Sequence, residues 1–281
     1  MAIQYGNHST SVLNVRYSAF LGMMYVADPE TEVLIEQAKA LVGEVEVKKG
    51  YTGSKGDSST AKALKFLRDA GCNPIKNISG ILTSAKMIER ELQTSRKSLY
   101  LTIGLRDEDT KLWLSIDASQ PGAKMLARKL ANVEPGVATE ISLFATYDQR
   151  PGAARAYGNH GASVKQHGKE VEGIDPKALL SPRIEAAISA LVAAGIPKTD
   201  TETHSRRKSS VELAFHIELM QGVEKKFAEH YAAREQPMEH PSASDMPPHF
   251  ADYEDAYDDL QTDKSVTSYL SGQRSELATL M

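Results

Sequence analysis

The feature that most constrains the fold of this chain is a change in hydrophobic period at Ile78. Before this position apolar residues recur at helical spacing, whereas after it they alternate with polar residues. Strict alternation is typical of strands that have one buried face. Two such strands flank an acidic turn, and their apolar residues are Leu99, Leu101, Ile103, Leu105, Leu112, Leu114 and Ile116. We expect these seven side chains to face one core.

The order of the elements after Ile78 predicts a small barrel. ISGILTSAKMIERELQ reads as a long strand ahead of the two alternating ones, QPGAKMLARKLANV as a helix, and ATEISLFATYD as a fourth strand. SVKQHGKEVEGI is then a candidate hairpin or final strand. Three strands, a helix and two strands is the order of an OB-fold, a small Greek-key barrel. The sequence therefore predicts an α+β protein with a five-stranded OB-type β-barrel at 77–175.

Helical additions are expected on both sides of this barrel. Residues 1–76 are an N-terminal extension in which EVLIEQAKALVGEVEV and STAKALKFLRDAG carry helical apolar stripes. Residues 176–235 contain SPRIEAAISALVAAG and VELAFHIELMQGVEKKFAEHYAARE, joined by the polar, basic connector KTDTETHSRRKSS. Residues 236–281 are rich in Pro, Ser, His and Asp, which is typical of a disordered tail.

The net charge of −4 hides an asymmetry along the chain. Residues 235–281 hold ten acidic and two basic side chains, which leaves residues 1–234 with a net charge of +4. A mildly basic body can bind a polyanion. The acidic tail can dock on partner proteins or occupy the basic groove of its own barrel.

Composition also indicates the compartment. The single cysteine, Cys72, excludes an intrachain disulfide and a cysteine-based zinc site, and it fits a reducing environment. The N-terminal segment lacks the basic lead and cleavage site of a signal peptide. No apolar run approaches the ~20 residues that cross a bilayer. We expect a cytoplasmic protein without a membrane partner.

Enzyme motifs are not found at the spacing that their chemistry requires. GYTGSKGDSST has the glycines and lysine of a phosphate loop, but it has neither the GxxxxGK[ST] order nor a leading strand. The histidines show no HExxH arrangement, and the acids Asp107, Glu108 and Asp109 fit a turn. We therefore expect no enzyme, no catalytic residue, no metal and no cofactor.

The alternation that buries the leucines places other side chains on the opposite face. If Leu101 and Leu114 point inward, then Tyr100 and Trp113 point outward, together with Arg106 and Lys111. Single-stranded nucleic acid suits such a face, because bases stack on aromatic rings for about 1–3 kcal/mol each while cations follow the phosphates. The alternative is that Trp113 packs beneath the flanking helices, and the sequence leaves both open.

Further candidates surround this face. The cations of the central strands are Lys86, Arg90, Arg96, Lys97, Arg106, Lys111 and Lys165. Arg150, Arg155 and Tyr157 lie in the glycine-rich segment QRPGAARAYGNHGA, which can close over a bound strand or act as a mere connector. The basic cluster His204, Arg206, Arg207 and Lys208 is a candidate second phosphate contact.

The segment from ISGILTSAKMIERELQTSRKSLYLTIGLRDEDTKLWLSIDAS through ATEISLFATYD resembles the core of the OB-fold single-stranded DNA-binding proteins of tailed bacteriophages. This resemblance implies sequence-tolerant binding of single-stranded DNA in replication and recombination, in the cytoplasm of a bacterial host. The acidic C-terminal region is similar too, which implies docking of replication or transcription proteins. Here, however, residues 264–281 follow Asp263, whereas such families end in the acidic and aromatic tip.

Two other functions remain open. The helical pair at 182–233 could serve a transcription regulator or an RNA polymerase-binding adaptor that acts on duplex DNA or protein. A structural assembly protein could use the barrel for oligomer contacts, with Trp113 buried between subunits. The sequence does not decide the oligomeric state.

Overall fold

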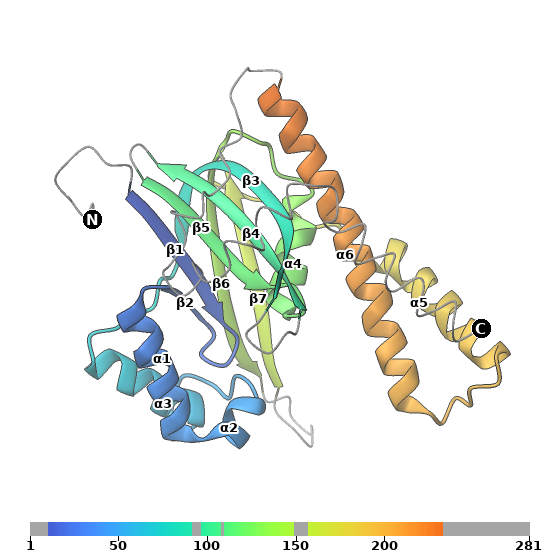
Figure 1. Ribbon diagram of the computed structural model, residues 1–281, viewed down its shortest axis with the longest axis horizontal. Helices are drawn as coiled ribbons and strands as arrows, with labels where there is room; N and C mark the ends of the chain where they lie inside the picture. The colour runs from blue at the N-terminus through green and yellow to red at the C-terminus, as the bar shows by residue number, and fades with distance from the viewer. Residues whose placement is uncertain (1–10, 92–96, 108–109, 149–156, 233–281) are drawn as a thin grey trace.

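The computed structural model describes residues 11–91, 97–107, 110–148 and 157–232. These residues form a mixed sheet of eight strands, covered by helices (Figure 1). The strands are β1 (Ser11–Ser18), β2 (Met23–Val26), β3 (Ile78–Glu91), β4 (Lys97–Asp107), β5 (Thr110–Asp117), β6 (Ala138–Asp148), β7 (Tyr157–Gln166) and β8 (Lys169–Glu170). The helices are α1 (Pro29–Val42), α2 (Glu44–Lys48), α3 (Ser59–Asp69), α4 (Pro121–Leu130), α5 (Pro176–Ala193) and α6 (Thr201–Ala232).

The central meander of β3, β4 and β5 forms as the alternation predicts. Its strands pair antiparallel, with Leu82 opposite Leu105 and Ile103 opposite Leu114. Of the seven expected core residues, six are buried in one cluster and Leu112 packs against it, partly buried. The shared inward face of β4 and β5 is therefore confirmed.

The five-stranded OB-type β-barrel is wrong, because the sheet has eight strands and does not close. Its order is β2-β1-β5-β4-β3-β6-β7-β8. β1 runs parallel to β5, from Ser11 opposite Thr110 to Arg16 opposite Ser115. In an OB-fold the last strand would occupy this edge of β5. Here β1 occupies it, and β7 pairs with β6 and β8 instead. The expected helical extension at 1–76 contains α1, α2 and α3, but two strands that the sequence analysis did not expect, β1 and β2, precede them.

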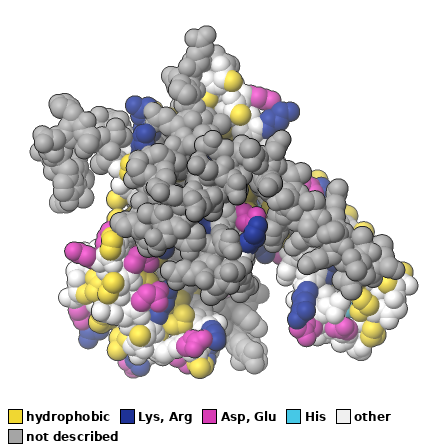
Figure 2. All heavy atoms as spheres, in the orientation of Figure 1, with side chains coloured by type: hydrophobic (Ala, Val, Ile, Leu, Met, Phe, Trp, Pro, Cys, Tyr) yellow, Lys and Arg dark blue, Asp and Glu magenta, His cyan; other side chains and the backbone are white. Residues whose placement is uncertain are grey.

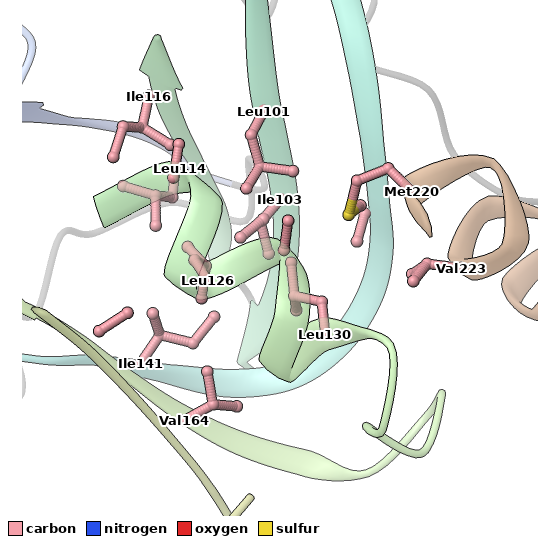
Figure 3. Packing of buried hydrophobic residues seen from close by; sticks show 14 of the residues in the cluster. Leu101, Ile103, Leu114, Ile116, Leu126, Leu130, Ile141, Val164, Met220 and Val223 are labelled. Carbon is pink, nitrogen blue, oxygen red and sulfur yellow. The ribbon is translucent and has the colours of Figure 1, made fainter. Parts of the chain in front are cut away.

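The main core lies between the meander, α4 and the second half of α6. Leu126 and Leu130 of α4 reach toward Leu114 and Ile141, while Met220 and other residues approach from α6 (Figure 3). Two hydrogen bonds fasten α6 here. The Tyr231 hydroxyl donates to the carbonyl oxygen of Leu82 at 2.9 Å, and Lys226 Nζ donates to that of Val133 at 2.5 Å.

A second, smaller core joins α1 and α3 to the β1–β2 hairpin. Its buried residues are Phe20, Leu21, Met23, Tyr25, Ile35, Ala38, Ala63 and Leu67. Both helices begin at a capping side chain, because Asp28 accepts a hydrogen bond from the Thr31 amide and Ser58 accepts one from the Ala61 amide. Hydrophobic side chains interspersed with charges cover the outer surface of this layer (Figure 2). The large exposed ones are Val33, Leu41 and Val45.

The helices after the sheet start earlier than the sequence indicated. α5 begins at Pro176, with Asp175 as its cap, and α6 begins at Thr201. The polar connector is thus largely the first turns of α6, where Asp200 accepts a hydrogen bond from the Thr203 amide at 3.0 Å. The two helices form a hairpin that projects from the sheet (Figure 1).

In the described part of the chain, no helix combines the length and apolar character needed to span a membrane. The expected tail at 236–281 lies outside the described residues.

Candidate nucleic-acid interface

The candidate interface is the side of β1, β5, β4 and β3 that faces away from the main core, called the outer face below. Two rows of cross-strand neighbours run across it. The first row is Asn14, Trp113, Gly104 and Ser84, and the second is Arg16, Ser115, Thr102 and Lys86. Tyr100 and Ile88 form a third pair, and Arg106 lies opposite Lys111 at the other end.

Trp113 lies on the outer face, as the alternation predicts, but the residue is only 7% exposed. It belongs to neither hydrophobic cluster. The edge of its six-membered ring rests on Gly104, where an added Cβ would come within 2.8 Å of Cζ3 and within 2.7 Å of Ser84 Oγ. Glycine at 104 is therefore what lets the indole lie against β4.

Four polar side-chain atoms in these two rows of the outer face are buried without a hydrogen-bond partner. They are Trp113 Nε1, Thr102 Oγ1, Ser115 Oγ and Ser84 Oγ. Leaving a buried polar group unsatisfied costs about 1–3 kcal/mol, so such groups call for an explanation. All four lie in the two cross-strand rows, which makes the cluster a property of this face.

Tyr100 differs from Trp113 because it is half-buried and stacked. The guanidinium carbon of Arg90 lies 5.1 Å from the centroid of its ring, which is a cation–π arrangement. Tyr100 and Arg90 come from β4 and β3, near the end of the outer face that is farther from Arg106.

The cations of the outer face have different surroundings. Arg106 is exposed and Lys111 is half-buried. Lys86 is close to Glu224 of α6, and burial lowers the pKa of Lys86, an effect that the charge of Glu224 opposes. Burial likewise raises the pKa of Glu224, against the charge of Lys86. Arg16 donates from Nη1 to Glu32 Oε1 of α1 at 2.9 Å.

The remaining expected site residues are not brought into these rows. Lys97 lies at the start of β4, with Nζ 3.8 Å from a Glu89 carboxylate oxygen. Lys165 lies on β7, where it pairs with Glu140 at 3.3 Å and lines an open cavity together with Asp107. Arg96, Arg150, Arg155 and the side chain of Tyr157 lie outside the described residues.

Sequence reasoning missed β1 with Asn14 and Arg16, and although it placed Thr102 and Ser115 on the outward face, it did not propose them as site residues. The signal for β1 was present, since Leu13, Val15 and Tyr17 alternate with polar neighbours. The hydroxyls of Thr102 and Ser115 follow from the same alternation that placed Trp113, but a serine or threonine on a strand carries no signal of its own.

Within the described ranges, no group of three or more His, Cys, Asp or Glu side chains is placed to hold a metal ion. No protein-family model, curated protein or solved structure matches the chain.

Proposed function

We propose that this protein binds single-stranded DNA across its outer face, without sequence preference and without chemistry, in replication or recombination. One observation carries the proposal: a single sheet face that belongs to neither core carries two aromatic residues, the half-buried Tyr100 and the 7% exposed Trp113, among Lys86, Arg90, Arg106 and Lys111. Aromatic rings interleaved with cations are the usual means of binding a single strand whatever its bases.

The dimensions of the outer face support this function. From Tyr100 to Arg106 the strand β4 extends about 20 Å, at roughly 3.4 Å per residue. Arg90 lies near one end of this span and Arg106 with Lys111 at the other. A strand of DNA running along β4 would thus meet cations before and after the aromatic side chains, an arrangement that suits several nucleotides.

The test is a titration of the full chain with labelled oligo-dT and with a duplex of equal length, at low and moderate salt, followed by anisotropy. We expect the single strand to bind more tightly and its affinity to fall steeply as salt rises, because phosphate neutralisation releases counterions. Tighter binding to the duplex, or affinity that salt does not change, would overturn the proposal.

The place of action follows from the same proposal. A protein of this kind would work in the cytoplasm of a bacterial host, and its acidic segment after residue 235 would dock replication or transcription proteins. Self-association on DNA is compatible with this function.

A second candidate function, a duplex-binding regulator or polymerase adaptor, is favoured by the α5–α6 hairpin. The hairpin projects from the sheet (Figure 1), and Leu179 of α5 is 51% exposed. Arg206 and Lys208 are exposed near the start of α6. If this function holds, the duplex binds more tightly, and R206A/K208A weakens duplex binding while substitutions on the outer face leave it unchanged.

A further inference from the structure

The outer face contains a compact set of hydrogen-bonding groups that no side chain or backbone atom satisfies. Thr102 and Trp113 are only 2% and 7% exposed, yet Thr102 Oγ1 and Trp113 Nε1 have no partner. Ser115 lies directly opposite Thr102, but the two hydroxyls do not satisfy each other. Directly opposed residues lie about 5 Å apart and diagonal ones about 7–8 Å, so one small ligand group can reach several of these atoms.

The chemistry of these groups indicates what they would bind. An indole N–H only donates, and a hydroxyl can donate by rotation, so together they suit a ligand group with several acceptor oxygens. The six-membered ring of Trp113 rests on Gly104 through Cζ3, and Nε1 belongs to the five-membered ring, away from this contact.

The surrounding charges indicate that the acceptor is an anion. Lys86 and Arg16 lie at the two ends of the row that contains Thr102 and Ser115. Each has a carboxylate near it, Glu224 for Lys86 and Glu32 for Arg16. These carboxylates offset only part of the positive charge, so the two ends of the row still favour an anion, and the neutral donors between them would supply hydrogen bonds to it. Phosphate oxygens commonly take hydrogen bonds from such donors.

We propose that Trp113, Thr102, Ser115 and Ser84 form a phosphodiester subsite, in which Trp113 donates through Nε1 instead of stacking on a base. Tyr100, half-buried and backed by Arg90, is then the stacking platform of the outer face. This inference rests on the proposed function, because the phosphodiester belongs to the single strand. It also accounts for sequence tolerance, since a backbone phosphate is the same at every nucleotide.

The first test compares Trp113→Phe with the wild-type chain in the oligo-dT titration, over a series of salt concentrations. Phenylalanine retains an aromatic ring but lacks the N–H. We expect affinity to fall roughly tenfold, as for loss of a hydrogen bond to a charged group. We also expect the slope of affinity against salt to stay unchanged, because a neutral donor releases no counterion. Tyr147→Phe on β6, whose side chain is 45% exposed, serves as the matched control.

The second test uses the wild-type chain and does not depend on how a variant folds. Trp113 is the single tryptophan, so the protein has one indole N–H signal in a nitrogen–proton NMR spectrum. We expect oligo-dT to move this signal downfield, and an oligo-dT with uncharged methylphosphonate linkages to leave it in place. A shift caused equally by both oligonucleotides would overturn the subsite.

The outcomes separate this inference from the proposed function. If the wild-type chain binds no single strand, the proposed function fails and the subsite fails with it. If single strands bind and Trp113→Phe retains wild-type affinity while Trp113→Ala loses it, Trp113 stacks and only the subsite is overturned.

Discussion

The Tyr17 hydroxyl lies 2.8 Å from Nδ1 of His160, which joins β1 to β7 although four strands separate them in the sheet. Their rings meet edge to face, and the ring of Tyr51 lies beside His160 as well. Side chains therefore connect β1 with β7, each of which lies next to an end strand of the sheet, although the two strands do not pair through their backbones.

We expect Tyr17→Phe to lower the free energy of unfolding by about 1 kcal/mol, the typical worth of such a hydrogen bond. Burial raises the pKa of Tyr17, so its hydroxyl is protonated and able to donate at neutral pH. Urea denaturation measures the change. Tyr147→Phe removes a hydroxyl from an exposed position and should leave the midpoint in place. Equal effects of the two substitutions would mean that the contact between Tyr17 and His160 does not stabilise the fold.

Stability should fall as the pH drops below about 6.5, the ordinary pKa of histidine. Burial lowers the pKa of both His160 and His216, so the folded state prefers these rings neutral. A group with a depressed pKa contributes stability that is present above its unfolded pKa and is lost as pH falls through its folded pKa. Melting temperatures between pH 5 and pH 8 measure this loss.

Glutamine substitutions attribute this acid sensitivity to particular residues. His160 is surrounded by Tyr17 and Tyr51, whereas His216 has Lys124 and Arg128 near it, which lower its pKa further, and Glu212, which opposes them. Each of His160→Gln and His216→Gln should flatten the pH profile relative to wild type. The raised pKa of Glu224 acts in the opposite direction and is common to all the proteins compared. A slope unchanged in both variants would contradict the assignment.

The strands with local partners were predictable from sequence, and those with distant partners were not. The alternation predicted which side chains of β4 and β5 face the core. Leu101 and Leu114 are examples, and they lie in neighbouring strands joined by a short turn. β1 pairs with β5 about a hundred residues away. Its own pattern indicates a strand but not a partner, and parallel pairing with β5 removed the edge that a barrel would have closed on.

The candidate site, too, was predictable from the sequence only in part. Alternation placed Trp113 and Tyr100 on one face, but it could not show that Trp113 would be 7% exposed. The close approach of the indole to β4 requires glycine at 104, because a Cβ there would come within 2.8 Å of Trp113 Cζ3. The early start of α6 depends on the Asp200 cap, a single side chain within a stretch that reads as a loop.

Gly104→Ala should disturb the outer face without touching the core. The new Cβ would lie 2.8 Å from Trp113 Cζ3 and 2.7 Å from Ser84 Oγ, so the indole must shift. We expect a changed Trp113 emission spectrum and oligo-dT binding weakened roughly tenfold, as for the loss of one good contact. Gly222→Ala is the control, because a Cβ there meets nothing within 4 Å and alanine favours the helix. Unchanged binding by Gly104→Ala would place the DNA elsewhere.

Arg106→Gln should lower the salt dependence of oligo-dT binding by about one unit of slope, because each phosphate contact releases close to one counterion. Arg106 is exposed at the end of β4, opposite Lys111, so it can approach a phosphate without breaking the fold. Lys62→Gln removes a charge from the exposed surface of α3, and it should leave the slope unchanged if the DNA follows the outer face. A log–log plot of affinity against salt measures both variants. Equal slopes for Arg106→Gln and Lys62→Gln would show that binding depends on net charge and not on this face.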